Sequence, residues 1–397
     1  MLGAIYTGLS GLNAFSKGLQ TISNNVANLN SPGFKATSTN FSDVFSYGGG
    51  GLTFFRGTDT AQLGNGVRFG EARTDFSQGD LRQSEGDLDL GIQGSGFLVL
   101  LNNGKTYYAR TGQFVVDKDG YISQQGDSDY RLAVLDGSGR AVPLNIDTRR
   151  TSAPVATTTI KFADNLSSSA TTATVADLAV YDAQGGKQTW QVKLDRVTTA
   201  QGEWTVTVTD QAGATVGTSA LKFVGSAVDP TTQKLTFTTT PQGASPLSVV
   251  LDFSSGVTSF SAGTTSTLRS ASIDGNGVGA LSSVTVDAEG KVKLTYSNEK
   301  TDILGAVAIA DFRDPQQLRR VSGGLFENNG SGPTRVIASN TDGVGRLVSK
   351  QIEASNVDLS QQFGDLILIQ RGFQASSQVV SATNDMIQQL FGIRGQG

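Results

Sequence analysis

The sequence contains no cysteine and no histidine, and only two methionines and two tryptophans among its 397 residues. These absences exclude thiol nucleophiles, Ser-His-Asp triads and most zinc sites, because each depends on one of the two missing residue types. Charge is nearly balanced, with 31 Lys and Arg against 35 Asp and Glu. A protein that binds nucleic acid usually carries a basic patch or stripe, so the balance argues against that class.

Long apolar runs are also absent. No stretch of 18 apolar residues occurs, so no membrane-spanning helix is predicted. The N-terminus, MLGAIYTGLSGLNAF, lacks the basic region and the cleavage pattern of a secretory signal peptide. If the protein leaves the cell, we expect it to use another route.

Short motifs with possible chemistry do not combine into a site. DKDG (117–120) fits a hairpin turn better than a calcium loop, because its glycine comes two residues too early. GIQGSG (91–96) lacks the lysine of a phosphate loop. Carboxylates such as Asp87, Asp89, Asp274 and Asp287 show no pattern that points to a glycosidase pair. We therefore expect no catalytic residue, no cofactor and no metal, and the chain is not predicted to be an enzyme.

What the sequence does contain is a helical pattern at each end. From the N-terminus, apolar residues recur at alternating steps of three and four, which is typical of a heptad seam. The positions are Ile5, Gly8, Leu12, Phe15, Leu19, Ile22, Val26 and Leu29. Because Pro32 disfavours helical geometry at Ser31, a helix within residues 1–30 should end near Asn28 or Leu29.

The C-terminal segment 351–397 repeats the pattern. Ser355 and Asp358 form the S-x-x-D version of a capping box, and Gly392 is a plausible stop. Between them the seam continues through Ile369, Phe373, Ser376, Val380, Thr383, Ile387 and Leu390. One stripe buries too little apolar surface to offset the backbone entropy of ordering a helix. We expect the two helices to pair as a coiled coil and to become ordered on assembly, although two core helices of one globular domain would show the same pattern.

Between the helices the sequence pattern predicts mostly β-strands. Residues 31–87 are predicted to be an irregular connecting segment, with SYGGGGLTF (46–54) as a flexible loop. Hairpins around Asn103-Gly104 and Asp119-Gly120 mark the first part of a β domain, 88–149, whose second part is 286–350. The Thr-rich segment 150–285, which holds both Trp190 and Trp204, is predicted to be an inserted outer β domain. The predicted fold class is α+β, mostly β, with terminal heptad helices pairing as a coiled-coil core around nested β-rich domains.

Two motifs at opposite ends of the chain resemble the signatures of a known family. SNNVANLNSPGFK (23–35) resembles the N-terminal signature of bacterial flagellar rod and hook proteins, and EASNVDLSQQFGDLILIQRGFQASSQVV (353–380) is similar to their C-terminal signature. LDLGIQGSGFLVL (88–100) and YYARTGQFVVDKDGYI (107–122) are similar to the family's shared β domain. Ser31, Gly372 and Phe373 stand where the family often has Thr, Ala and Tyr.

The resemblance implies a helical polymer of identical subunits. In this family the terminal helices form an inner coiled-coil core around an export channel, and β domains form outer layers. The implied route is unfolded passage through the flagellar type III export apparatus, without a cleaved signal peptide, to an extracellular place in the flagellum. The expected partners are other copies of the chain, the distal rod, the hook cap and the hook–filament junction proteins, with no nucleic acid and no membrane insertion.

Within the family, the length and the extra β domain favour a structural subunit of the flexible hook, which links the rod to the filament and transmits motor torque. A distal rod protein with an inserted domain and a secreted β-rich adhesin or binding module are the alternatives. Straight tubes would indicate the rod protein, and ligand binding by a monomer without its terminal helices would indicate the adhesin.

The assembly residues implied by this reading lie in the two seams and in the N-terminal signature. They are Ile5, Leu12, Phe15, Leu19, Ile22, Asn24, Asn25, Val26, Asn28, Gly33, Phe34, Leu366, Ile369, Phe373, Val380, Ile387 and Leu390. The short asparagine amides can cap the helix end and bond to adjacent backbones without bulk. Gly33 can adopt a backbone angle closed to other residues, so that Phe34 re-enters an apolar contact. A local helix stop without any role between subunits would use the same residues.

Overall fold

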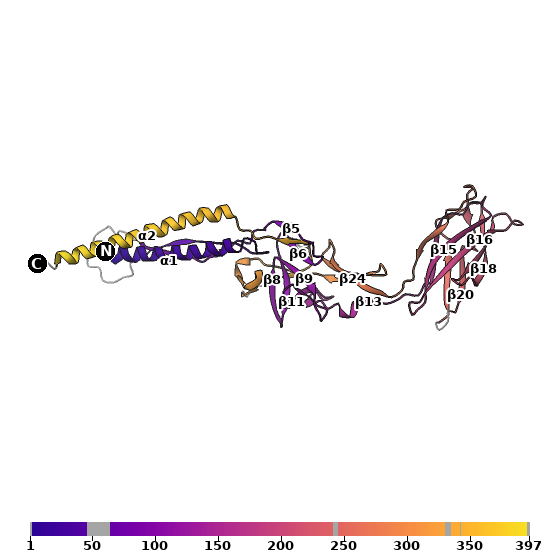
Figure 1. Ribbon diagram of the computed structural model, residues 1–397, viewed down its shortest axis with the longest axis horizontal. Coiled ribbons are helices and arrows are strands. Elements are labelled where there is room, and N and C mark those ends of the chain that lie inside the picture. Colours follow the sequence, from indigo (N-terminus) through magenta and orange to yellow (C-terminus); the bar gives the residue numbers. More distant parts are fainter. Residues whose placement is uncertain (1, 46–63, 241–244, 330–334, 342, 395–397) are drawn as a thin grey trace. The chain divides into compact units, whose positions relative to one another are not determined.

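The computed structural model describes residues 2–45, 64–240, 245–329, 335–341 and 343–394 (Figure 1). The chain divides into two compact units. Unit 1 comprises Met1–Asp147, Val284–Lys293 and Ile303–Gly397, and unit 2 comprises Thr148–Ser283 and Leu294–Asp302. Neither long helix is apolar enough along its described length to cross a membrane.

Both predicted terminal helices are present in unit 1. Helix α1 is Leu2–Ala27 and helix α2 is Leu359–Arg394. The cap of α2 differs from the prediction: the Oδ1 atom of Asp358 accepts hydrogen bonds from the backbone of Ser360 at 2.8 Å and Gln361 at 3.1 Å. Asp358 is therefore the N-cap, and the capping box that began at Ser355 is wrong. The stop at Gly392 is also wrong, because a glycine costs only about 1 kcal/mol within a helix and the helix continues past it.

The prediction that residues 31–87 are irregular is wrong for the described part of that segment, which contains five short strands. They are β1 (Thr37–Ser38), β2 (Phe41–Phe45), β3 (Gly64–Phe69), β4 (Arg73–Thr74) and β5 (Leu81–Gln83). β1 pairs with β4, β2 pairs with β3, and β5 pairs with β32 (Gln351–Glu353), the strand that precedes α2 in the sequence. Strands this short leave no alternating pattern to detect in the sequence. The predicted loop at 46–54 lies outside the described residues.

The remainder of unit 1 is a twelve-stranded antiparallel sheet with apolar side chains on both faces. Its N-terminal strands are β6 (Asp89–Gln93), β7 (Phe97–Asn102), β8 (Lys105–Ala109), β9 (Thr111–Val116), β10 (Ile122–Gln124), β11 (Asp127–Leu135) and β12 (Ala141–Pro143). The later strands are β27 (Ile309–Asp311), β28 (Leu318–Arg320), β29 (Leu325–Asn328), β30 (Arg335–Ile337) and β31 (Arg346–Ser349), and β32 (Gln351–Glu353) follows and pairs with β5. Both predicted hairpins are confirmed, with Asn103 and Gly104 at positive φ between β7 and β8 and the Asp119-Gly120 turn between β9 and β10.

Strand β7 explains why FLVLL is apolar without a break. Leu98 and Leu100 belong to the core on one face of the sheet, whereas Phe97 and Val99 belong to the core on the other face. Both faces are covered, so the alternation between polar and apolar residues disappears.

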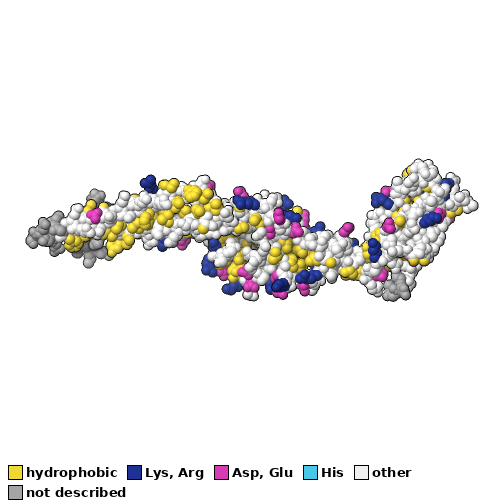
Figure 2. Space-filling view, viewed as in Figure 1, with side chains coloured by type: hydrophobic (Ala, Val, Ile, Leu, Met, Phe, Trp, Pro, Cys, Tyr) yellow, Lys and Arg dark blue, Asp and Glu magenta, His cyan; other side chains and the backbone are white. Residues whose placement is uncertain are grey.

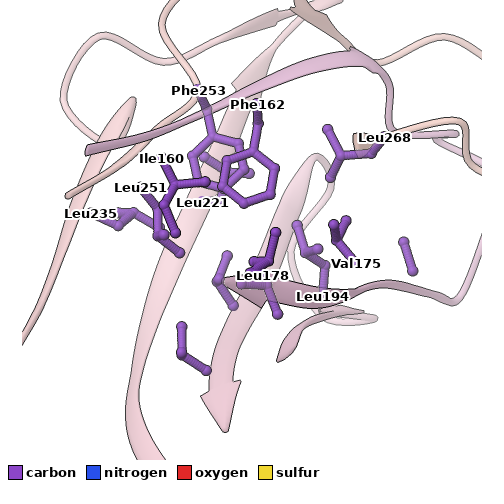
Figure 3. Close-up of a cluster of buried hydrophobic side chains, with 14 of the residues drawn as sticks. Ile160, Phe162, Val175, Leu178, Leu194, Leu221, Leu235, Leu251, Phe253 and Leu268 are labelled. Carbon is purple, nitrogen blue, oxygen red and sulfur yellow. The ribbon is translucent and has the colours of Figure 1, made fainter. Parts of the chain in front are cut away.

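Unit 2 has a separate core built on a ten-stranded sheet. Its strands are β14 (Thr159–Asn165), β15 (Thr172–Tyr181), β16 (Lys187–Arg196), β17 (Glu203–Thr209), β18 (Thr215–Val224), β19 (Ala227–Val228), β20 (Lys234–Thr239), β21 (Leu247–Asp252), β22 (Val257–Thr258) and β23 (Arg269–Ile273). A smaller sheet contains β13 (Thr151–Ser152), β24 (Gly279–Val286), β25 (Lys291–Tyr296) and β26 (Thr301–Ala306), of which residues 284–286, 291–293 and 303–306 belong to unit 1. Trp190 and Trp204 are buried in one core, as predicted. In the same core the rings of Phe162 and Phe253 stack 4.6 Å apart (Figure 3).

Candidate assembly surface and the joint between the chain ends

Helices α1 and α2 lie side by side in unit 1 and run in opposite directions (Figure 1). Gly8 of α1 faces Val380 in the second half of α2, whereas Gly18 faces Ile369, closer to the start of α2. A Cβ atom at either glycine would fall 2.7 Å from the facing side chain. The glycines therefore set the close approach of the two helices.

The seam that faces α2 is displaced from the predicted stripe. It runs through Gly8, Gly11, Phe15, Gly18, Ile22 and Asn25. The predicted stripe shares Gly8, Phe15 and Ile22 with this seam. Of its other members, Leu29 lies beyond the end of α1, and the four within the helix are only half-buried: Ile5, Leu12, Leu19 and Val26. Since residues of a helix follow one another at about 100°, these four side chains lie at the edge of the helix contact.

A second face of α1 is covered by the hairpin of β2 and β3. The backbone N–H of Val67 donates to the Oγ atom of Ser10 at 3.2 Å. The ring of Phe41 lies 5.4 Å from that of Phe15 and 6.0 Å from that of Phe69, between centroids. Sequence reasoning missed this contact because β2 and β3 are separated by residues with no strand pattern.

The N-terminal signature forms a joint between α1, the returning chain and the start of α2. Asn25, 1% exposed, accepts a hydrogen bond from the backbone of Thr37 at 3.0 Å and donates to the Thr37 carbonyl at 2.8 Å. Its amide also donates to Gln362 Oε1 of α2 at 2.9 Å. Asn28 instead bonds to the carbonyl and side chain of Asn24 on the helix surface. Asn25 is thus the asparagine that connects the three segments.

Gly33 and Phe34 fix the next step of the chain. Gly33 has φ +68, as expected for a position that glycine favours, and its N–H donates to the Glu353 carbonyl at 2.8 Å. Phe34 is buried under the guanidinium group of Arg320, 4.3 Å from the ring centroid. The two residues direct the chain from α1 into the β sheet of unit 1.

Directly after Phe34, three charged side chains meet in the interior of unit 1. Lys35 and Glu353 are fully buried, and the Lys35 Nζ atom lies 2.5 Å from the Glu353 Oε1 atom. Arg110, 3% exposed, donates from Nε to Glu353 Oε2 at 3.0 Å. Burial lowers the pKa of Lys35, and the neighbouring Glu353 acts in the opposite direction. We call Lys35, Arg110 and Glu353 the buried triad.

The described residues contain no group of three or more acidic side chains suited to a metal ion. Asn24, Asn28, Gly33 and Phe34 line an open groove of about 640 Å³ beside residues 319–324. The ends of the chain thus build a joint with a groove on its surface.

Comparisons with known proteins match both sides of this joint. The family described as "Flagella basal body rod protein" matches residues 5–35, and "Flagellar basal body rod FlgEFG protein C-terminal" matches residues 348–393. Both ends of the chain are therefore similar to flagellar rod and hook proteins.

Flagellar hook proteins align along nearly the whole length of this chain. It is 26% identical to the flagellar hook protein FlgE of Treponema pallidum, covering 99% of this chain and 100% of that protein. It is 27% identical to FlgE of Escherichia coli K12, covering 97% of this chain and 98% of that protein. It is 28% identical to FlgE of Rhizobium meliloti, covering 99% of each chain. The fold is similar to that of Helicobacter pylori flagellar hook protein FlgE2, with a TM-score of 0.51 at 14% identity, over 69% of this chain and 100% of that chain.

Helices α1 and α2 leave much apolar surface uncovered. Figure 2 shows apolar side chains gathered along the helical part of unit 1. Ten of the sixteen exposed large apolar side chains in the described part of the chain lie on the helices: Tyr6, Leu9, Leu359, Phe363, Ile367, Leu368, Phe373, Val379, Met386 and Phe391. The helices carry five charged side chains among 62 residues, 26 in α1 and 36 in α2. Few charges and much exposed apolar area are typical of a surface that is covered in an assembly.

The predicted assembly residues of α2 occupy different environments. Ile369 is buried against α1, and Leu366, Val380 and Ile387 are half-buried. Phe373 is exposed, and the side chain of Leu390 lies outside the described part of the structure. Sequence reasoning missed Lys35, Arg110 and Glu353, although all three stand inside the motifs that carry the family resemblance.

Proposed function

We infer that this chain is a structural subunit of the flagellar hook, the tube that links the rod to the filament and transmits motor torque. The relatives that align with nearly the whole chain are named flagellar hook proteins. This favours the hook over a rod protein or an adhesin. The observation in the molecule that supports self-assembly is the apolar surface with few charges that is left open on α1 and α2.

The placement of the segments in the tube is part of the proposal. The segments 1–30 and 351–397, which contain α1 and α2, form the inner core. The segments 88–149 and 286–350 form the next layer, and 150–285 forms the outer domain. Half-buried Ile5, Leu12, Leu19 and Val26 at the edge of the helix pair are suited to contact the helices of a neighbouring copy. Copies then add by heterologous contacts that do not close into a ring.

The remaining partners follow from membership of the family. We propose that the tube contacts the distal rod at one end, and the hook cap and hook–filament junction proteins at the other. Export through the flagellar type III apparatus without a cleaved signal peptide belongs to the same proposal.

Electron microscopy of the concentrated full-length protein tests the function. Wild type should form curved tubes. I367Q and L368Q replace exposed residues of α2, so they should keep the wild-type circular dichroism and lose the tubes. V224Q, which changes an exposed apolar residue of unit 2, is the matched control and should form tubes. Straight tubes from wild type would indicate a rod protein, and tubes from I367Q and L368Q would overturn the proposed helical core.

A further inference from the structure

The buried triad contains two cations from the N-terminal part of the chain and one anion from its C-terminal part. Lys35 and Arg110 precede Glu353 by 318 and 243 positions. Both oxygens of the Glu353 carboxylate are used: Oε1 accepts from Lys35 Nζ at 2.5 Å and from the Gly79 N–H at 2.9 Å, and Oε2 accepts from Arg110. A single carboxylate therefore balances two buried cations.

Arg110 cannot turn away to solvent while the sheet keeps its geometry. Its guanidinium group also donates to the carbonyl oxygens of Gly96 at 2.5 Å and Gly94 at 2.7 Å. The other acidic group acting on Lys35 is Asp75, which is exposed and accepts hydrogen bonds from Ser77. Without Glu353, closing the joint would bury Lys35 beside Arg110 with no carboxylate between them, and an unpaired buried charge is strongly destabilising.

The backbone of the joint depends on the same C-terminal segment. The N–H of Ala36 donates to Asn356 Oδ1 at 2.7 Å, and the N–H of Glu353 donates to Thr111 Oγ1 at 3.1 Å. The hydrogen bonds that hold residues 33–36 are therefore completed in the same event that brings the carboxylate.

We propose that Glu353 is a completion switch: the joint between α1 and the sheet of unit 1 closes only after the C-terminal segment has placed this carboxylate between Lys35 and Arg110. In a chain that lacks Glu353, residues 31–37 stay undocked, because the two cations Lys35 and Arg110 have no carboxylate to balance their charge. The loss of a few packing contacts is not the main cause. Because the C-terminal segment of a chain is synthesised last, the joint beside the helix pair would close only once the whole chain is present. The inference concerns folding of the single chain and stands apart from the proposed function.

Charge balance can be separated from packing by a double-mutant cycle in the full-length protein. E353Q keeps the shape of the side chain and leaves two cations unbalanced. K35M leaves Arg110 and Glu353 as an ion pair whose charges cancel. The K35M/E353Q double variant has one unbalanced cation, whereas E353Q has two. E327Q is the matched control, since Glu327 forms an exposed ion pair with Arg319 in the same unit.

Hydrogen exchange at the Gly33, Ala36 and Thr37 amides gives the readout. E353Q should raise their exchange rates roughly 100-fold or more over wild type, and E327Q should leave them unchanged. K35M/E353Q should exchange at least about tenfold more slowly than E353Q. A double variant that exchanges as fast as E353Q, or faster, overturns the proposal, and so does an E353Q protein that behaves like E327Q. If E353Q unfolds unit 1 altogether, K35M must restore it; the fluorescence of Trp190 and Trp204 follows unit 2 as an internal reference.

The order of events is measured by pulse labelling during refolding of the wild-type chain. The Thr37 amide bonds to Asn25, so both partners are N-terminal. It should nevertheless gain protection together with the Glu353 amide. Protection of Thr37 before Glu353 would overturn the switch.

Discussion

The backbone of Gly372 in α2 lies against the ring of Phe15 in α1, so that a Cβ atom at position 372 would fall 2.5 Å from the Phe15 Cζ atom. A glycine within a helix costs about 1 kcal/mol relative to alanine. The ring of Phe15 occupies the space that an alanine methyl group would take. Gly372 therefore serves the packing of the helix pair and is not simply a weak point of α2.

Replacing Gly372 by alanine should destabilise the helix pair although alanine is the better helix former. We expect G372A to lower the free energy of unfolding by about 1–3 kcal/mol, because overpacking exceeds the gain in propensity. The measurement is urea unfolding followed by far-UV circular dichroism. G364A is the matched control: nothing lies within 4 Å of a Cβ atom at Gly364, so this variant should be about 0.5–1 kcal/mol more stable. Equal gains from both variants would contradict the packing argument.

Asn25 should be the sensitive asparagine of the N-terminal signature. N25A leaves the N–H and carbonyl of Thr37 and the Oε1 atom of Gln362 without their partner, and should cost about 2–3 kcal/mol of stability. N24A, on the exposed face of α1, should change stability by less than about 0.5 kcal/mol. Hydrogen exchange at the Thr37 amide checks the local effect, and a similar loss in N24A would show that the joint does not depend on Asn25.

Unit 2 should lose stability in acid partly through Asp274. Partial burial alone would raise the pKa of this carboxyl group, but hydrogen bonds from Thr158 and Thr159 outweigh it and hold the pKa below the ordinary 3.8. A lowered folded-state pKa contributes stability that is present above pH 3.8 and lost as the pH falls through the folded-state pKa.

Urea unfolding at a series of pH values, followed by tryptophan fluorescence, measures this contribution, because both tryptophans lie in the core of unit 2. D274N should flatten the fall in stability below pH 3.8. T158V removes one of the hydrogen-bond donors to Asp274 and should reduce the slope by a smaller amount. An unchanged slope in D274N would exclude Asp274 as a source of the acid sensitivity.

The elements that the sequence predicts well are those whose signals are local. The helix end near Asn28 follows from Pro32, and the turn at Asn103-Gly104 follows from two residues that accept positive φ. The buried triad carries no such signal, since Lys35 and Glu353 are 318 positions apart and each would ordinarily be placed on the surface. Only the tertiary fold brings these charges together.

The register of the helix seam shows a different limit. Hydrophobic periodicity counts large side chains, so it finds Leu12 and Leu19 and passes over Gly11 and Gly18. In the structure the glycines face α2, because two helices that approach closely need small residues at the contact. The large residues beside them are left half-buried, which is where a neighbouring copy would contact the helix pair.

This register gives the last prediction. Ile22, 3% exposed, belongs to the contact within the chain, whereas Leu19 lies at its edge. I22A should therefore cost about 2–4 kcal/mol in the free energy of unfolding of the single chain, and L19A about 1 kcal/mol or less. In assembly L19A should have the larger effect relative to its cost in stability. It should raise the protein concentration needed for tubes by more than its loss of stability accounts for. Unfolding by circular dichroism and tube formation by light scattering measure the two effects. An L19A chain as unstable as I22A would place Leu19 inside the helix pair and restore the stripe predicted from periodicity.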